Sequence, residues 1–170
     1  MKILVYLNFK MNEESLYRES VELLKKLIST QSFSFQEENT ATLLENWLNK
    51  NSIPFKRHVN NIYCYNKYYN EEKPNILLNS HHDTVEPNDS YTNDPYEPIV
   101  DHGKLYGLGS NDAGAALVSL LSTFKFFYDC KNLNYNLIFL ASAEEEKSGE
   151  NGIKSVMTKL PKIDLSLIHI

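Results

Sequence analysis

The chain has 170 residues, the length of one ordinary domain, and 42% of them are hydrophobic, which suffices for a single buried core. Its formal net charge of −5 excludes the basic surface that binding to nucleic acid or to an anionic membrane requires, so we expect neither partner. The two cysteines, Cys64 and Cys130, form no C-x-x-C pair and fit a reduced, cytoplasmic protein, with a disulfide between them as the alternative.

The first ten residues lie ahead of Met11, which begins a more natural protein start, Met11-Asn12-Glu13-Glu14. The apolar stretch within residues 1–10 is too short for a signal peptide, and no small-residue cleavage site follows it. We therefore interpret residues 1–10 as a non-native extension from an upstream start codon.

Two amphipathic helices are predicted next. The first covers residues 14–28, where apolar side chains recur at helical spacing. The second covers residues 37–49 and ends before Pro54, because proline cannot continue a helix.

The remainder of the chain alternates strands with helices. Predicted strands cover residues 55–58, 62–65, 75–80 and 136–143; predicted helices cover residues 112–128 and 152–160. The continuous apolar runs at 75–80 and 136–143 indicate central strands that helices cover on both faces. The fold class that follows is α/β, with layers of helices around a largely parallel sheet.

Clusters of ionisable residues follow both apolar strands, and in open α/β sheets functional groups gather beyond the carboxyl ends of strands. Ser80-His81-His82-Asp83 follows the first strand. Residues two apart in an extended chain point to the same side, so we expect Asp83 to orient His81 as a metal ligand while His82 faces away. The alternative is a surface turn with solvated histidines.

Asp112 is expected at the N-terminus of the helix over residues 112–128. The helix dipole there favours the ionised carboxylate. An ionised carboxylate can bridge two cations, although a simple helix cap is the alternative.

Three adjacent glutamates, Glu144, Glu145 and Glu146, follow the second apolar strand. Negative charges this close repel one another unless a cation offsets them, although a solvated acidic face is the alternative. One glutamate can bind a metal while its neighbour moves a proton, as metal-assisted hydrolysis requires. Oxygen and nitrogen ligands without thiolate suit catalytic zinc, with cobalt or manganese as substitutes.

At these positions the sequence resembles the M20 metallopeptidase and deacylase family. The segments that carry the resemblance are SHHDTV, LYGLGSND and SAEEEKSG, and the similarity spans roughly residues 16–164. The amino-acid sequence of these segments most resembles that of acetylornithine deacetylase-like members from Bacteroidetes-type bacteria. The resemblance implies a three-layer αβα zinc-peptidase-like catalytic domain, of which residues 11–164 form the N-terminal part.

The resemblance also implies roles for individual residues. His81 and Glu146 each hold one zinc, Asp112 bridges the two, Asp83 supports His81, and Glu145 is the general base. The extra acid leaves a register of Glu144/Glu145 as the alternative to Glu145/Glu146. The implied substrate is an N-acyl amino acid, and the full-length protein is expected to be a homodimer through a lid domain.

The chain departs from the family towards its C-terminus. Two further ligands, a carboxylate after the strand that begins at Ile163 and a C-terminal histidine, are missing, as is the lid domain. Residues 165–170 resemble a translated sequencing adapter, and we interpret them as an artefact at the end of a truncated gene. We therefore expect this chain to be inactive alone.

The most favoured activity of the family members is N-acetylornithine deacetylation in arginine biosynthesis. Succinyl-diaminopimelate desuccinylase, aminoacylase and dipeptidase activities of the same family are the alternatives. A non-catalytic metal-binding domain is the alternative of another class, and a proton-shuttling neighbour beside the metal-binding glutamate speaks against it.

Overall fold

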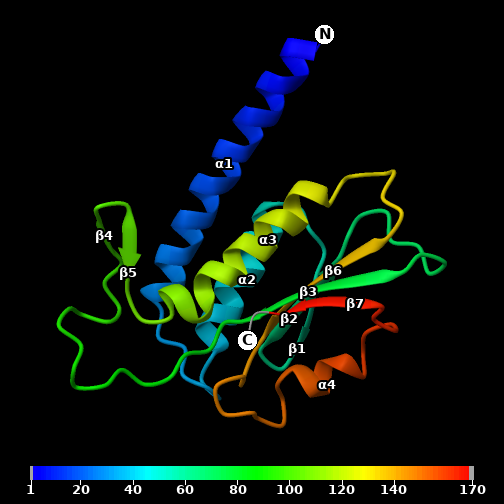
Figure 1. Ribbon diagram of the computed structural model, residues 1–170. Coiled ribbons are helices and arrows are strands. Elements are labelled where there is room, and N and C mark those ends of the chain that lie inside the picture. Colours follow the sequence, from blue (N-terminus) through cyan, green and yellow to red (C-terminus); the bar gives the residue numbers. More distant parts are fainter. Residues whose placement is uncertain (1, 169–170) are drawn as a thin grey trace.

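The computed structural model describes the backbone of residues 2–168 and the side chains of residues 13–167 (Figure 1). Helices and strands alternate along most of the chain, as the sequence predicts. The elements in chain order are α1 (Lys2–Ile28), α2 (Glu38–Lys50), β1 (Lys56–His58), β2 (Asn61–Tyr65), β3 (Asn75–His81), β4 (Ile99–Asp101), β5 (Lys104–Tyr106), η1 (Ser110–Gly114), α3 (Ala115–Phe127), β6 (Asn136–Ser142), α4 (Ile153–Met157) and β7 (Leu165–Ile168).

The main sheet has five strands in the order β1-β2-β6-β3-β7. Strand β3 runs parallel to both β6 and β7, whereas β2 is antiparallel to β6 and also to β1. Strand β1 therefore points the same way as β3, β6 and β7, and only β2 opposes them. The predicted α/β class with a largely parallel sheet is confirmed.

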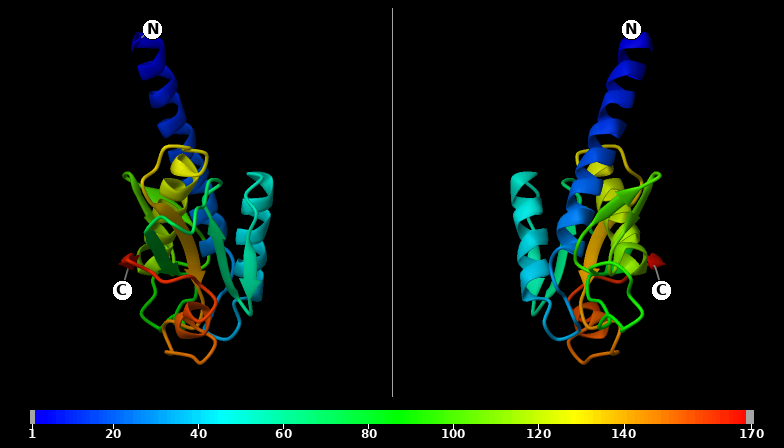
Figure 2. Two further views of the ribbon diagram at one scale, coloured as in Figure 1. Left: turned by 90° about the vertical axis from the view of Figure 1, so that its right-hand side faces the viewer. Right: turned by 90° about the vertical axis from the view of Figure 1, so that its left-hand side faces the viewer.

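Helices cover both faces of this sheet, which gives three layers (Figure 1). Helices α1, α2 and α3 share one core with the inner side chains of β2, β3 and β6. On the opposite face, Val156 of α4 packs with Leu77, Ile138 and Leu140. The side views show α2, in cyan, alongside the strands and α4, in orange, at the lower end of the sheet (Figure 2).

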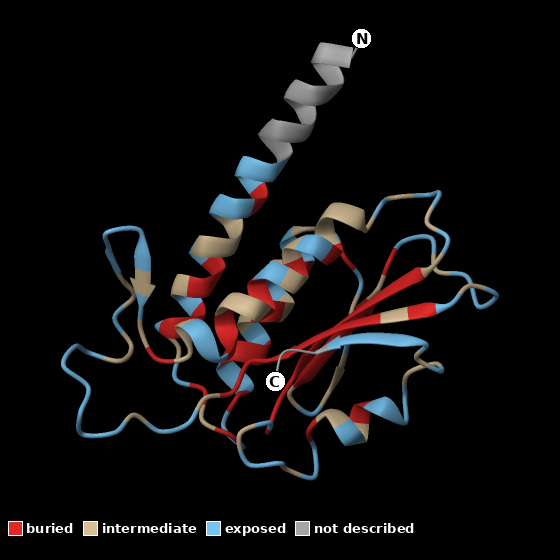
Figure 3. Cartoon of the chain, in the orientation of Figure 1, coloured by how far each residue is buried: buried red, intermediate tan, exposed pale blue. Residues whose placement is uncertain are grey.

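Burial follows the predicted pattern in the two apolar strands. Every residue of β6 is buried, and so is every residue of β3 except Ile76 (Figure 3). Because side chains on both faces are covered, a continuous apolar run replaces the alternation of a half-exposed strand. Strand β7 lies at the sheet edge, and its Leu165 and Leu167 are exposed.

Several element boundaries differ from the prediction. Helix α1 begins at Lys2 instead of residue 14, since an existing helix extends at the gain of one hydrogen bond per added residue. Helix α4 is shorter than predicted, and the hairpin of β4 and β5 was not predicted.

The prediction that Asp112 begins a helix is wrong. Helix α3 begins at Ala115, and Asp112 lies in η1 with extended dihedral angles, φ −115° and ψ 98°, ahead of a cis peptide bond to Ala113. Gly109 has a φ of +71°, and the amide of Gly114 donates to its carbonyl oxygen over 2.8 Å. This turn displaces the aspartate from the helix end.

The two predicted terminal artefacts stay predictions. Side chains of residues 1–12 and residues 169–170 lie outside the described part of the chain, and residues 165–168 form β7. Within residues 2–168, no helix combines the length and the apolar character needed to cross a membrane.

Candidate metal centre

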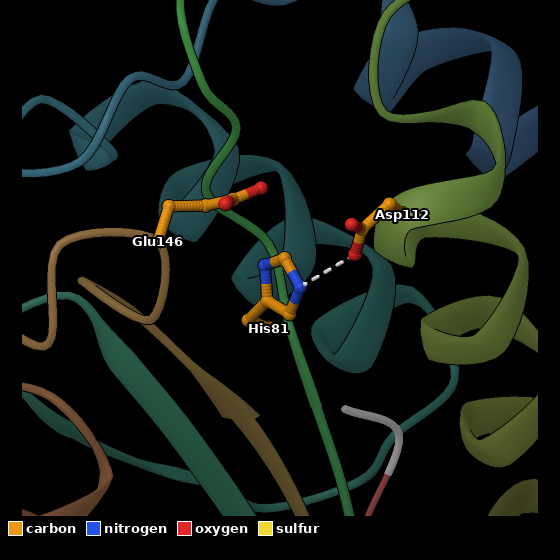
Figure 4. A group of neighbouring side chains, drawn as sticks. All are labelled: His81, Asp112 and Glu146. Carbon is orange, nitrogen blue, oxygen red and sulfur yellow. Dashed lines mark hydrogen bonds and ion pairs between the residues drawn. The ribbon is translucent and has the colours of Figure 1, made fainter.

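The carboxyl ends of the parallel strands β3 and β6 bring two of the predicted clusters together. His81 ends β3 and pairs in register with Ser142, which ends β6. Glu146 follows four residues after Ser142, and Asp112 approaches from η1. Figure 4 shows the side chains of His81, Asp112 and Glu146 converging from these three segments. One potential ligand atom from each lies within 4.8 Å of the others.

His81 is buried, and its two ring nitrogens face different partners. Nδ1 lies 3.0 Å from the carbonyl oxygen of Asp83 and 3.4 Å from its carboxylate. Nε2 lies 3.1 Å from Asp112 Oδ1 and 3.7 Å from Glu145 Oε2. When Nδ1–H donates to Asp83, the lone pair of Nε2 is free for a metal. Asp83 thus contacts His81 through both groups, with the carbonyl oxygen as the nearer acceptor, and its role in supporting a metal ligand stays a prediction.

The charges around His81 favour its protonated form in the metal-free protein. Burial lowers the pKa of His81, but the Asp83 carboxylate and the nearby Glu145 outweigh burial and raise this pKa to about 9. A divalent cation would take the place of this positive charge among the surrounding carboxylates.

Asp83 connects the end of β3 to the segment after β6. Its fully buried carboxylate accepts hydrogen bonds from Ser34 Oγ at 2.7 Å and from the backbone amides of Glu145 and Glu146, each at 3.1 Å. Burial raises the pKa of Asp83, but hydrogen bonds from His81, Ser34 and the two amides lower it below its ordinary value. Asp83 therefore holds the glutamate backbone as well as His81.

The three adjacent glutamates divide between two environments. Glu144 is buried, and its carboxylate accepts hydrogen bonds from the Asn151 backbone amide at 2.9 Å and from Asn151 Nδ2 at 3.2 Å. Glu145 lies on the side of His81, and Glu146 belongs to the converging group. Burial raises the pKa of Glu146; His81 lowers it, and the neighbouring acids Asp112, Asp83 and Glu145 raise it further.

Asp112 is the most exposed member of the converging group, with 67% of its side chain exposed. It reaches His81 although it does not begin a helix, because η1 passes beside the end of β3. Ser80 Oγ donates to the carbonyl oxygen of Ala113 over 3.3 Å and ties the two segments together.

His82 turns away from the centre, as the alternation along a strand predicts. It is buried instead of solvated, which contradicts the surface-turn alternative. Its Nδ1 lies 2.9 Å from Thr40 Oγ1, and its Nε2 lies 2.9 Å from the Asn60 carbonyl oxygen. Burial lowers the pKa of His82 and so favours the neutral ring.

The donor set fits a divalent transition metal. An imidazole nitrogen and two carboxylate oxygens, with no thiolate, are ligands of catalytic zinc and also suit cobalt or manganese. Sequence reasoning missed Ser34, and it also missed the buried Glu37, whose carboxylate accepts the Glu144 amide at 3.1 Å. Neither residue belongs to a local motif that could have indicated its contact.

The sequence is similar to a known protein family. The profile described as "Peptidase family M20/M25/M40" matches residues 77–170, more than half of the chain. Succinyl-diaminopimelate desuccinylase of Sulfurovum sp. (strain NBC37-1) is 25% identical over 147 residues, which cover 85% of this chain and 39% of that protein. The protein of that name from Wolbachia pipientis subsp. Culex pipiens is 28% identical, with coverage of 87% and 39%.

Solved structures share the fold. The M20 family metallo-carboxypeptidase Sso-CP2 from Sulfolobus solfataricus has a TM-score of 0.70 and 23% identity, and the match covers 88% of this chain and 37% of that one. The dipeptidase Dug1p from Saccharomyces cerevisiae has a TM-score of 0.73 and 17% identity, with coverage of 93% and 39%. This chain thus spans about two-fifths of the length of the curated relatives it matches.

Proposed function

The chain belongs to the peptidase family M20/M25/M40, a family of metal-dependent hydrolases, and from this premise we propose that it forms part of a two-zinc enzyme that cleaves the amide bond of N-acyl amino acids. The observation that carries the proposal is the convergence of His81, Asp112 and Glu146, with ligand atoms within 4.8 Å of one another. These three residues would hold the metal.

Each acid of the centre has a separate task in the proposed reaction. When bound, zinc polarises the amide carbonyl and lowers the pKa of a water molecule from 15.7 to roughly 7. Glu145 takes the proton of the attacking water and returns it to the departing amine. Asp83 orients His81 and fixes the backbone that carries Glu145 and Glu146. The products are a carboxylate and a free amine.

The contacts of Glu144 support the Glu145/Glu146 register over the alternative. Its carboxylate is occupied by Asn151, and its side chain is buried away from His81. Glu145, in contrast, lies within 3.7 Å of His81 Nε2, where a general base beside a metal-bound substrate is required.

The acyl group and the amino acid of the substrate are a separate part of the proposal. N-acetylornithine is the substrate that the sequence motifs favour, and it stays a prediction. The relatives that carry the name succinyl-diaminopimelate desuccinylase support the succinylated diamino acid instead, and we place it first. Dimerisation through a lid domain and a cytoplasmic location also stay predictions.

A metal titration of this chain tests the centre directly. Calorimetric titration with Zn²⁺ or Co²⁺ is expected to show binding that Glu146→Gln weakens strongly. The matched variant Glu144→Gln removes a charge of the same sign from the neighbouring position and is expected to weaken binding much less. Equal losses in the two variants would contradict the proposed register.

The activity itself is tested with the complete gene product, since this chain spans about two-fifths of its relatives. Succinyl-diaminopimelate, N-acetylornithine and a dipeptide are compared as substrates. Glu145→Gln is expected to retain metal and lose turnover. Metal binding without hydrolysis of any of the three would favour a non-catalytic metal-binding domain.

A further inference from the structure

Glu37 is a fully buried carboxylate outside the metal centre. It occupies the N-cap position of α2, but its side chain makes no capping hydrogen bond, so helix capping does not explain it. Its Oε1 accepts the backbone amides of Phe35 at 2.8 Å and of Glu144 at 3.1 Å. Its Oε2 accepts Asn60 Nδ2 at 2.9 Å. A buried carboxylate thus joins two segments that lie 107 positions apart.

Both residues whose amides Glu37 accepts have a strained backbone. Phe35 has a φ of +75° and Glu144 a φ of +57°, in the left-handed region that residues with a Cβ rarely adopt. Such conformations persist when the surrounding contacts hold them in place. The carboxylate of Glu37 supplies that contact at both positions.

The two strained residues stand next to the groups that build the metal centre. Phe35 follows Ser34, which donates to Asp83. Glu144 precedes Glu145 and Glu146, whose amides Asp83 accepts. Three successive backbone amides, 144 to 146, are therefore held by two buried carboxylates, Glu37 for the first and Asp83 for the other two.

We infer that Glu37 is a positioning residue of the metal centre. It fixes the backbone of Glu144 and so sets the position of the backbone that continues into Glu145 and Glu146. It also fixes the backbone of Phe35, which places Ser34 against Asp83. The inference rests on the proposed function, because it assigns Glu37 to the same centre.

The charge of Glu37 is compatible with burial because N–H donors surround it. The positive charge of Arg57 lies one hydrogen-bonded residue away. Arg57 Nη2 donates to Asn60 Oδ1 over 2.7 Å, and Asn60 Nδ2 donates to Glu37. Glutamine at position 37 keeps one oxygen that can accept both backbone amides, whereas alanine keeps none. The two substitutions therefore separate loss of charge from loss of the contact.

The first experiment measures the backbone without a metal. Amide hydrogen exchange of the metal-free chain, followed by ¹⁵N NMR, is expected to show protection at residues 144–146 although they lie outside any helix or strand. Glu37→Ala removes this protection and Glu37→Gln largely retains it. Glu38→Gln, which changes an adjacent surface carboxylate paired with Arg57, leaves it unchanged.

The second experiment records the metal centre itself through the d–d absorption of Co²⁺. Glu37→Ala is expected to alter the spectrum and to weaken Co²⁺ binding about 10- to 100-fold, the range for residues that support ligands. The Co²⁺ affinity of Glu37→Gln is expected to lie between that of Glu37→Ala and that of the wild type. Leu44→Ala controls for stability, because it opens the core at a fully buried position of the same helix without touching the segment 144–146.

The outcomes separate this inference from the proposed function. If Glu37→Ala keeps the protected amides and the wild-type spectrum, or if Leu44→Ala alters the spectrum as much, the positioning role is refuted. If the wild-type chain binds no Co²⁺, the proposed metal centre fails instead. In that case loss of protection at residues 144–146 in Glu37→Ala still supports the structural link, and retained protection overturns it.

Discussion

Replacing Asp83 with asparagine tests whether one buried carboxylate holds the metal centre together. The side chain is fully buried, lies 3.4 Å from His81 Nδ1, and accepts three further hydrogen bonds, one from Ser34 Oγ and one each from the amides of Glu145 and Glu146. The two amides donate to different oxygens of the carboxylate. Asparagine keeps the shape of aspartate but offers one oxygen and one NH₂ group. In either orientation, the NH₂ group faces one backbone N–H.

The magnitude follows from these contacts. A buried N–H that loses its acceptor costs about 1–3 kcal/mol, and each remaining hydrogen bond changes from a charged to a neutral acceptor, a loss of about 1 kcal/mol. Removal of a buried charge offsets part of this loss. We expect Asp83→Asn to lower the free energy of unfolding by about 3 kcal/mol. For a chain of this size, that lowers Tm by about 6–12 °C.

Urea unfolding of the metal-free chain measures this difference without any contribution from ligand binding. Asp129→Asn is the matched control, since Asp129 is an exposed carboxylate that pairs with Lys67 and its replacement is expected to leave the free energy of unfolding nearly unchanged. If the free energy of unfolding of Asp83→Asn lies within about 0.5 kcal/mol of the wild-type value, Asp83 is not the link between β3 and the glutamates. Substitutions at ordinary surface positions fall in that range.

Three further predictions concern the metal, a glycine and the thiols. Zn²⁺ at 100 times its Kd is expected to raise the free energy of unfolding by about 2.7 kcal/mol in thermal or urea unfolding, and Glu146→Gln to remove most of that gain. Gly149→Ala places a Cβ against the carboxylate of Glu144, so we expect a loss of about 1–3 kcal/mol by the same measurement; an unchanged stability would contradict the buried position of that carboxylate. A thiol reagent is expected to modify Cys130 alone in the folded chain, because Cys64 is buried and burial raises the pKa of its thiol, and to modify both in denaturant; rapid reaction of both in the folded chain would contradict this packing.

Sequence periodicity was sufficient to predict the two strands that position His81 and the glutamates. Strands β3 and β6 are buried on both faces, and this burial leaves a continuous apolar run that any reader of the sequence can find. Parallel strands end at the same edge of a sheet, so His81 and the glutamates were expected together. The Glu145/Glu146 register was open in the sequence, because three identical side chains in a row carry no information about which one Asn151, seven positions after Glu144, binds.

Contacts between distant segments could not be predicted in the same way. Glu37 at the start of a predicted helix carries no local signal of a distant contact, and only the fold brings it to Glu144. Asp112 was misplaced because an aspartate ahead of an apolar helical run is a common helix N-cap. The turn that displaces it depends on the contact of Gly114 with the Gly109 carbonyl and with Leu24, which is close enough to exclude a Cβ.

Burial divides the acids of this region into two groups with different physical constraints. Glu37, Asp83 and Glu144 are buried, and each is surrounded by N–H donors, as an ionised carboxylate away from water requires. Asp112 and Glu145 are exposed and Glu146 is half-buried, and all three stand near His81 with part of their hydrogen-bonding capacity open to solvent. The oxygens of the buried acids accept hydrogen bonds from the protein, whereas those of Asp112, Glu145 and Glu146 are accessible to a cation. The acids that hold the backbone are therefore different residues from those proposed to hold the metal, and this separation lets ligand geometry be fixed before any metal arrives.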